Sequence, residues 1–260
     1  MTELKGFNLA KVEKRIDWTG ELFSLRVSGA PLSFKAGQFT KLALLDEQGN
    51  PISRAYSVVN APSEQFEWLE FLVVANPEGQ LTPRLQQLQT GDSIYVGETA
   101  HGDLIHDTIP KHANDLWLLS TGTGIGPFLS LLDDINLLPH SDHIVLVHGV
   151  RYERDLVYKY LIEQLQQRYE GRLRYVPIVS RESTPGKLQG RIPDLIASGE
   201  LVNRADLPFS KESSFVMMCG NPEMIKDTSP VLQELGLDKY RARTGGNIIY
   251  ERYWQALTDF

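Results

Sequence analysis

The pattern of apolar residues changes once along this chain of 260 residues, and the change divides the sequence into two parts. In the first part, short runs rich in β-branched and aromatic residues alternate with turn residues. These runs are Leu22–Val27, Phe39–Leu45, Tyr56–Val59, Phe66–Val74 and Ser93–Val96. Closely spaced strands of this kind predict an antiparallel β-barrel. One short helix is expected within it, with Thr82 as the N-cap and Pro83 at the first helical position.

The second part, after Asp107, alternates between apolar strands and helices. The expected strands are Leu116–Leu119, Ile144–Val147, Leu173–Val179 and Phe215–Met218, and the expected helices are Phe128–Leu132, Asp155–Arg168 and Pro222–Leu235. This alternation predicts a parallel sheet with helices on both faces. We therefore expect two domains, a barrel over residues 1–105 and an α/β domain over residues 106–260.

Composition excludes several classes of protein. The net charge of -7 argues against broad nucleic-acid binding. Cys219 is the single cysteine, which excludes an intrachain disulfide, a cysteine-built zinc site and an iron–sulfur cluster held within this chain. The first residues lack the layout of a signal peptide, and no apolar run is long enough to cross a bilayer. We expect a cytoplasmic monomer with no membrane or nucleic-acid partner.

The segment Arg54-Ala55-Tyr56-Ser57 follows a turn and carries a cation, an aromatic ring and a hydroxyl. Alternation along a strand places Arg54 and Tyr56 on one face and Ser57 on the other. A guanidinium suits a phosphate, a phenol ring suits stacking on a flat heterocycle, and a hydroxyl can hydrogen-bond a ring nitrogen. A flavin nucleotide needs these three groups. The alternative is an ordinary barrel strand with a solvated Arg and a half-buried Tyr, and these four residues alone favour neither.

A glycine-rich segment, residues 120–127, lies between an expected strand and an expected helix. Its glycines let backbone N–H groups approach an anion, and the helix N-terminus adds a partial positive charge. The glycines at 122, 124 and 126 match neither the usual dinucleotide fingerprint nor a P-loop. The segment predicts a phosphate loop, and the alternative is a tight strand-to-helix turn.

Three arginines, Arg151, Arg181 and Arg191, follow later strands or turns. Ligands of open parallel sheets bind beyond the carboxyl ends of the strands, so these guanidinium groups are expected to favour a doubly charged phosphate such as the 2′-phosphate of NADP. Solvated surface arginines are the alternative. Cys219 is expected at the same sheet edge, unless it is only small apolar filling. The aromatic run Ile248–Trp254 either packs as a last strand or covers something flat.

With these residues in place, nearly the whole chain resembles the bacterial ferredoxin/flavodoxin–NADP reductases, and most of all their enterobacterial-type flavodoxin reductases. The resemblance rests on the order and spacing of short segments. These are Ala36–Thr40, Arg54–Ser57, Leu81–Leu85, Thr121–Thr123, Val179–Glu182, Gly190–Pro193, Met218–Pro222 and Tyr253–Trp254. It implies a ferredoxin reductase-like fold, in which an FAD-binding barrel is followed by an NADP-binding domain and the flavin lies between them.

The resemblance also implies roles for single residues. Arg54 would pair with the FAD pyrophosphate, Tyr56 would stack on the flavin, and Ser57 would hydrogen-bond near flavin N5. The implied cofactor-binding residues are Arg54, Ala55, Tyr56, Ser57, Gly79, Leu81, Thr82, Thr121, Gly122, Tyr253 and Trp254, of which Thr121 and Gly122 would hold the NADP pyrophosphate. The implied NADP-binding residues are Thr121, Gly122, Arg151, Arg181, Arg191, Cys219 and Asn221. Ser57, Cys219, Glu251 and Tyr253 are the implied catalytic set.

Within that set, Glu251 matches an acidic position that aids proton transfer, and Cys219 would lie beside the nicotinamide. Tyr253 would cover one flavin face and move aside for hydride transfer, while Trp254 would stack on the FAD adenine. Replacing Tyr253 by Ser is therefore expected to strengthen NADP binding and slow turnover. The closest relatives we recognise stop at the Trp, whereas residues 255–260 continue here, and this tail bears on both aromatic positions.

The expected activity moves electrons between NADPH and one-electron carriers, ferredoxin or flavodoxin, through bound FAD. Such carriers are acidic, so a local basic patch is expected, with Lys41 and Arg84 as candidates. Two alternatives remain at this point. One is a free-flavin or ferric-chelate reductase of the same fold, and the other is a non-catalytic regulator that senses NADP or flavin.

Overall fold

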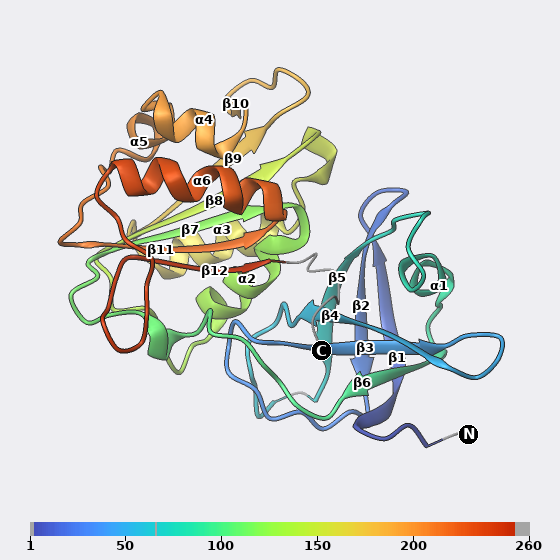
Figure 1. The fold of residues 1–260 in the computed structure, drawn as a ribbon. Helices are drawn as coiled ribbons and strands as arrows, with labels where there is room; N and C mark the ends of the chain where they lie inside the picture. The colour runs from blue at the N-terminus through green and yellow to red at the C-terminus, as the bar shows by residue number, and fades with distance from the viewer. Residues whose placement is uncertain (1–2, 66, 253–260) are drawn as a thin grey trace.

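Two sheets form the framework of the molecule (Figure 1). The computed structural model describes residues 3–65 and 67–252, and in this part each of the two sheets has six strands. The first sheet is antiparallel and the second is parallel. Strands β1 to β6 form the first sheet, and strands β7 to β12 form the second. The expected fold class, an antiparallel barrel followed by an α/β domain, is confirmed.

The antiparallel sheet has the strand order β4-β3-β6-β1-β2-β5 and curls until its edge strands β4 and β5 approach one another. Its elements are β1 (Phe7–Asp17), β2 (Leu22–Ser28), β3 (Phe39–Leu45), β4 (Pro51–Ser57), β5 (Leu69–Val74), α1 (Thr82–Gln87) and β6 (Ser93–Gly97). Alternate residues of these strands point inward and form an apolar core that includes Phe23, Leu25 and Phe71. Leu81 and Leu85 at α1 close one end of this core.

The parallel sheet has the strand order β10-β9-β8-β7-β11-β12. Its strands are β7 (Asp115–Thr121), β8 (His143–Val150), β9 (Leu173–Val179), β10 (Leu188–Gln189), β11 (Ser214–Gly220) and β12 (Ile248–Arg252). The helices are α2 (Gly126–Asp133), α3 (Lys159–Arg168), α4 (Ile192–Ala197), α5 (Glu200–Ala205) and α6 (Pro222–Glu234), with short 3-10 turns η1 (His106–Thr108), η2 (Gly122–Ile125) and η3 (Glu153–Asp155). The run that ends the described chain is thus a last strand.

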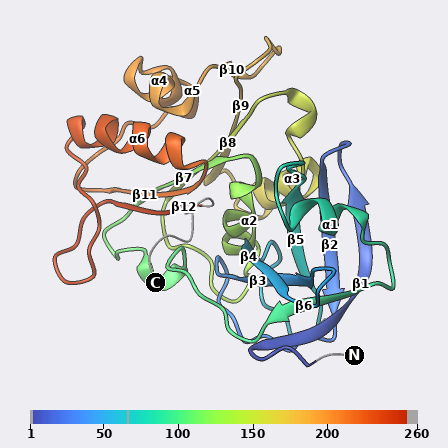
Figure 2. The same ribbon diagram turned by 45° about the vertical axis from the view of Figure 1, so that its right-hand side comes forward.

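Helices cover both faces of the parallel sheet because its strands are apolar on both sides. Helices α2 and α3 pack on the face that also meets the barrel, in one core with Leu22 and Leu72 of β2 and β5 (Figure 2). Helices α4, α5 and α6 cover the opposite face. The two domains therefore share a continuous apolar core at one face of the sheet.

Several expected elements differ in their bounds. Helix α1 has Leu81 as its N-cap, and Thr82 is its first residue, because the Thr82 hydroxyl bonds the backbone of Asn76. Strand β4 ends at Ser57, so half of the run Tyr56–Val59 is outside it, although Val58 and Val59 are buried. Helix α3 begins at Lys159, four residues later than expected, since Tyr158 before it has a left-handed backbone with φ 60°.

Strand β1 and the elements β10, α4 and α5 were not expected from the apolar pattern. In β1, lysine, glutamate and arginine separate the apolar residues, so its pattern resembles a solvated segment. No helix in the described part of the chain is long and apolar enough to span a bilayer.

Candidate functional site

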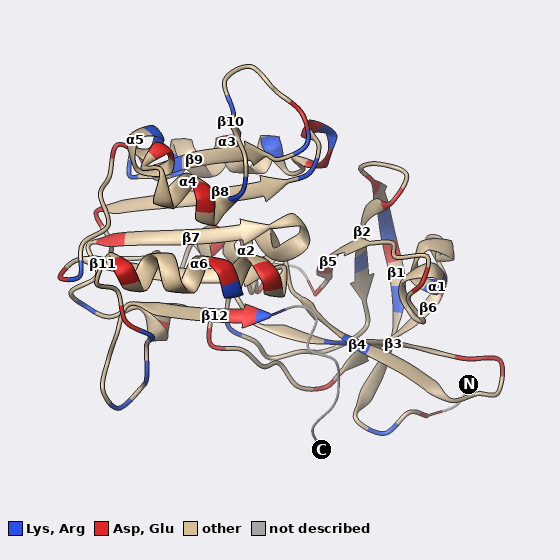
Figure 3. Ribbon diagram, turned by 45° about the horizontal axis from the view of Figure 1, so that its top comes forward, with Lys and Arg blue, Asp and Glu red and all other residues tan. Residues whose placement is uncertain are grey.

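A cleft of about 1100 Å³ lies where the carboxyl ends of the parallel strands face the barrel. From the barrel it is lined by the turn between β1 and β2, Trp18 to Leu22, and by Val74. From the α/β domain it is lined by loops after β7, β8, β9, β10 and β11, with Thr121, Gly122, Arg151, Arg181, Arg191 and Asn221 among the residues. Figure 3 shows basic and acidic residues alternating in the loops beyond β8 and β9.

The glycine-rich segment turns sharply at the end of β7, and two glycines at this turn, Gly124 and Gly220, have no room for a side chain. A Cβ on Gly124 would lie 2.4 Å from the carbonyl oxygen of Cys219. A Cβ on Gly220 would lie 2.4 Å from the Thr121 hydroxyl oxygen, and Gly220 has φ +129°. The backbone of β7 and β11 thus meets closely here, and the 3-10 turn η2 leads directly into α2.

Thr121 and Asn221, on neighbouring strand ends, are joined at this point. The Asn221 backbone N–H donates to the Thr121 hydroxyl over 2.9 Å, and the Asn221 side-chain oxygen accepts from the backbone N–H of Glu223 over 2.8 Å. The second bond caps helix α6. The two predicted residues are therefore held side by side at the cleft.

His148 supports the glycine-rich segment from within the sheet, and sequence reasoning missed it. Its Nε2 donates to the carbonyl oxygen of Gly122 over 3.1 Å, and its ring is fully buried. Burial lowers the pKa of His148 to about 4, so the ring is neutral at neutral pH. Strand β8 contains two histidines, His143 and His148, and nothing in its sequence distinguishes the buried one that has this role.

The loops that carry two of the predicted arginines run together. The backbone N–H of Arg181 donates to the carbonyl oxygen of Arg151 over 3.0 Å, so the loops after β8 and β9 continue the sheet pairing. Lys187 pairs with Glu153 over 2.7 Å across the same two loops. The third arginine, Arg191, precedes α4. The structure thus brings all three predicted arginines to the rim of one cleft.

Arg191 has a partner that the sequence did not indicate. Its Nη2 lies 3.1 Å from the carboxylate of Asp227 on α6, and both side chains are about half exposed. An exposed ion pair of this kind contributes little stability. It fixes the direction of the Arg191 side chain toward α6, one turn beyond the cleft residues Glu223 and Met224.

The segment Arg54–Ser57 lies on β4, at the edge of the antiparallel sheet. Arg54 and Tyr56 pair with Leu42 and Thr40 of β3 and share one face, while Ser57 is buried on the other, as alternation predicts. Arg54 and Ala55 are exposed. Burial raises the pKa of Tyr56 to about 12, so its phenol keeps its proton.

The loop before α1 is closed by the Thr82 hydroxyl, which donates to the carbonyl oxygen of Asn76 and accepts from its backbone N–H. A Cβ on Gly79 would lie 2.8 Å from that hydroxyl oxygen. Leu81 is buried beneath the loop. Within the loop from Gly79 to Thr82, Gln80 is exposed, whereas Leu81 and Thr82 are buried.

Glu251 and Cys219 pair with one another in register on β12 and β11. The Glu251 carboxylate accepts the backbone N–H of Asp103 over 2.8 Å, which ties the last strand to the segment that follows the barrel. Burial raises the pKa of Glu251 to about 7, because its two backbone hydrogen bonds only partly offset the desolvation. Cys219 is fully buried in the core shared by α2 and α3. Tyr253, Trp254 and the tail lie outside the described residues.

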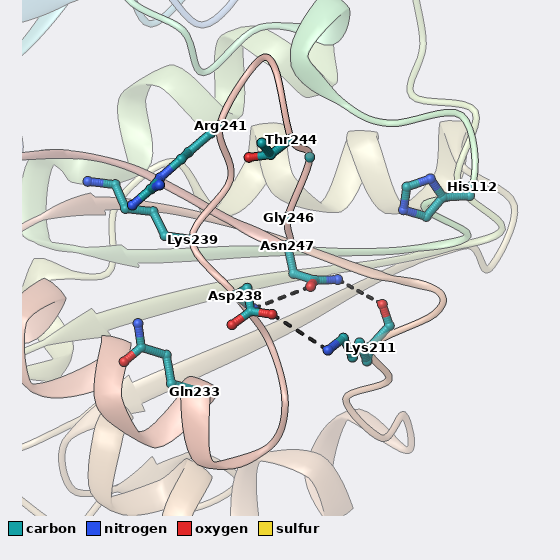
Figure 4. Close-up of a pocket in the computed structure, with 10 residues that line it drawn as sticks. His112, Lys211, Gln233, Asp238, Lys239, Arg241, Thr244, Gly246 and Asn247 are labelled. Carbon is teal, nitrogen blue, oxygen red and sulfur yellow. Dashed lines mark hydrogen bonds and ion pairs between the residues drawn. The ribbon is translucent and has the colours of Figure 1, made fainter.

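A second cavity, of about 550 Å³, lies at the amino ends of β11 and β12, the opposite edge of the sheet (Figure 4). Lys211 lies 3.6 Å from Asp238 there, and the Asn247 amide donates to the carbonyl oxygen of Lys211 over 2.9 Å. Lys239 donates to the Tyr250 hydroxyl over 3.2 Å. This cavity and the cleft have no lining residue in common.

Comparison with known families agrees with the two sheets and the cleft. Residues 10–103 match the oxidoreductase FAD-binding domain, and residues 118–230 match the oxidoreductase NAD-binding domain. The chain is therefore an oxidoreductase that pairs a flavin-binding domain with a nicotinamide-dinucleotide-binding domain.

Similar proteins narrow this class. A flavodoxin/ferredoxin–NADP reductase of Escherichia coli K12 is 49% identical over 218 residues, which is 84% of this chain and 86% of that protein. A ferredoxin–NADP reductase of Pseudomonas aeruginosa is 39% identical over 248 residues, 90% of this chain and 93% of that protein. A crystal structure of a ferredoxin NADP+ reductase from Neisseria gonorrhoeae with bound FAD and NADP superposes with a TM-score of 0.88 at 33% identity, covering 96% and 100% of the two chains. The chain belongs to the flavodoxin/ferredoxin–NADP reductase family, and the resemblance noted in the sequence is confirmed.

Proposed function

We propose that this protein moves electrons between NADPH and the one-electron carriers ferredoxin and flavodoxin through bound FAD. The observation that carries the proposal is the cleft, in which the glycine-rich segment and the three arginines of the α/β domain face the barrel. FAD supplies a group that accepts hydride from NADPH and releases electrons singly. The protein's own task is to hold both nucleotides in place.

For FAD, Arg54 is proposed to pair with the pyrophosphate and Tyr56 to stack on the flavin ring. The exposed guanidinium and the protonated, half-buried phenol suit these roles. Ser57 is proposed to hydrogen-bond near flavin N5. Ala55 and the backbone from Gly79 through Leu81 to Thr82 complete the site, and the absence of a side chain at Gly79 suits close approach of a pyrophosphate.

For NADPH, Thr121, Gly122 and Asn221 are proposed to hold the pyrophosphate at the start of η2. Arg151, Arg181 and Arg191 are proposed to hold the 2′-phosphate of the adenosine. Guanidinium groups suit this dianion because each offers several donors in one plane.

Glu251 and Cys219 are proposed to lie beside the nicotinamide. A carboxyl group with a pKa of about 7 holds or releases a proton near neutral pH, which suits the proposed part of Glu251 in proton transfer. Tyr253 and Trp254 remain proposed covers of the flavin and the adenine on the family resemblance alone.

The proposed carriers are acidic proteins, and Lys41 and Arg84 stay candidates for a basic patch that attracts them. Lys41 is exposed on β3 opposite Ala55. The monomeric state, the cytoplasmic location and the domain limits 1–105 and 106–260 also stay predictions. Sedimentation of the purified protein tests the first of these.

Steady-state reduction of ferredoxin and flavodoxin, with NADPH compared with NADH, tests the function. We expect NADPH to be preferred by at least ten-fold. Failure of NADPH to reduce either carrier would contradict the proposal. A protein that is colourless after desalting but reduces added flavin would instead be a free-flavin reductase, and one with no NADPH-dependent dye reduction would be a binding regulator.

Arg181→Leu is a sharper test of the arginine rim, which consists of Arg151, Arg181 and Arg191. Because only NADPH carries the 2′-phosphate, we expect this change to raise KM for NADPH at least ten-fold and to leave the reaction with NADH unchanged. Arg243→Leu, in an exposed loop before β12, serves as the control for loss of one positive charge. An equal rise in KM for NADPH and for NADH would show that Arg181 does not recognise the 2′-phosphate.

A further inference from the structure

A buried chain of hydrogen bonds crosses the interface between the two domains. The Tyr158 hydroxyl, from the α/β domain, lies 2.6 Å from the Ser24 hydroxyl of β2 and 2.6 Å from the carboxylate of Glu70 on β5. The other carboxylate oxygen of Glu70 accepts from Arg26 over 2.6 Å. Ser24 and Glu70 are no more than 3% exposed. Tyr158 is the one member that the α/β domain supplies.

The direction of these bonds follows from the chemistry of the groups. An ionised carboxylate only accepts, so the single proton of the Tyr158 hydroxyl points to Glu70. Ser24 must then donate to Tyr158, and Ser24 itself accepts from the indole N–H of Trp18 over 2.8 Å. Burial raises the pKa of Tyr158 well above its ordinary value, so this proton stays in place at every physiological pH. The hydrogen bonds therefore all point the same way, from Trp18 through Ser24 and Tyr158 to Glu70.

The backbone at Tyr158 is held in a costly conformation. Its φ is 60° and its ψ is 24°, the left-handed region that bulky residues rarely adopt. This residue directly precedes α3 and ends the loop that carries Arg151 and Asp155 along the cleft. The surrounding contacts must maintain this conformation, and the phenol hydroxyl makes two of them.

Trp18 connects these hydrogen bonds to the cleft. Its ring lies 4.9 Å from the Tyr158 ring, centre to centre, and its side of the turn between β1 and β2 forms the barrel's wall of the cleft. The hydrogen bond of its indole N–H to Ser24 sets the direction of the ring. Removing the Tyr158 hydroxyl would thus loosen the wall as well as the interface.

We propose that Tyr158 is a positioning residue, whose phenol locks the α/β domain and the Trp18 turn to the barrel and so sets how closely bound NADPH approaches the flavin. Hydride transfer needs reacting atoms held at ~3–3.5 Å, so a small rotation between the domains slows it more than it weakens binding. The proposal rests on the proposed function for its kinetic part only.

Tyr158→Phe removes one oxygen atom and tests the proposal. We expect FAD content and the Kd for adenosine 2′,5′-bisphosphate to stay within two-fold, since that ligand needs only the arginine rim. Flavin reduction by NADPH in a stopped-flow instrument should slow at least five-fold, with a larger primary deuterium isotope effect. Amide exchange in residues 18–24 should become faster. Tyr160→Phe, two residues further on in α3 at a residue that is 72% exposed, should change none of these quantities.

Ser24→Ala provides a second test should Tyr158→Phe fail to fold. It breaks the same chain from within the barrel, leaves the α/β domain untouched, and should give the same slowing and the same faster exchange. A lower Tm with unchanged flavin reduction and isotope effect would overturn the proposal, because Tyr158 would then be merely structural. If the unmodified protein does not oxidise NADPH, the proposed function fails, whereas equal rates in the variant and the unmodified protein refute only the positioning role.

Discussion

Glu251 shows at the scale of one residue how burial creates a group that titrates near neutral pH. Its ordinary pKa of 4.5 rises to about 7 because the carboxyl group is largely removed from water beside Asp103. The family resemblance implies a role for the acidic residue at this position, but the shift of its pKa depends on the barrel segment that packs against it. Desolvation by a distant part of the chain cannot be inferred from the residue's neighbours.

Glu251→Gln gives a prediction with a defined sign. Between pH 4.5 and pH 7 the unfolded chain has released the proton that the folded chain still holds, so the free energy of unfolding falls as the pH rises through this range and is level above it. The variant lacks this loss. We expect its Tm, relative to that of the unmodified protein, to improve from pH 5 to pH 8 in thermal unfolding. A difference in Tm that is constant over this range would contradict the raised pKa.

At the scale of the element, the strand-to-helix segment after β7 was predicted from its glycines, and its position beside Asn221 was not. Alternation of strands and helices is a local pattern, so β7, α2 and β8 follow from it. The contact between Gly124 and the carbonyl of Cys219 joins residues almost a hundred positions apart. Likewise, β1 was missed because its exposed face is charged, and only pairing with β2 and β6 makes it a strand.

Gly124→Ala tests this close approach. Its Cβ would lie 2.4 Å from the Cys219 carbonyl oxygen, which belongs to backbone and cannot rotate away. The segment from Gly122 onward must therefore shift, and we expect NADP+ to bind at least ten-fold more weakly, about 1.4 kcal/mol. FAD content should not change, because the barrel is not involved. Titration with NADP+ measures the effect, and unaltered affinity would show that the segment adapts without loss.

At the scale of the whole molecule, the two domains meet through bonds from separate elements. Besides Tyr158 and Glu251, Ser130 on α2 accepts the backbone N–H of Gly37 over 3.2 Å and donates to the carbonyl oxygen of Asn60 over 2.9 Å. Together with the shared apolar core, these bonds fix the barrel against the sheet. The cleft is thus a property of the assembled chain, since neither domain forms both of its walls.

The charge of the whole molecule leads to a prediction about its carriers. The net charge of -7 repels acidic proteins, so their attraction requires a local basic patch. We expect the rate of carrier reduction to fall as salt rises, and Lys41→Gln to reduce that dependence. Lys211→Gln, at the edge of the sheet opposite the cleft, is the matched control. A rate independent of salt in the unmodified protein would argue against electrostatic recruitment.

The sequence by itself determined the fold and the family, and it proposed the groups that suit FAD and NADPH, because strand and helix periods and short motifs such as Arg54–Ser57 are local. Only the tertiary structure decided which of those groups meet. It placed Arg151, Arg181 and Arg191 at one rim, set His148 beneath Gly122, paired Arg191 with Asp227 and inserted Tyr158 between Ser24 and Glu70. Such contacts join residues far apart in the chain, and their energies arise from burial and packing that no local pattern records.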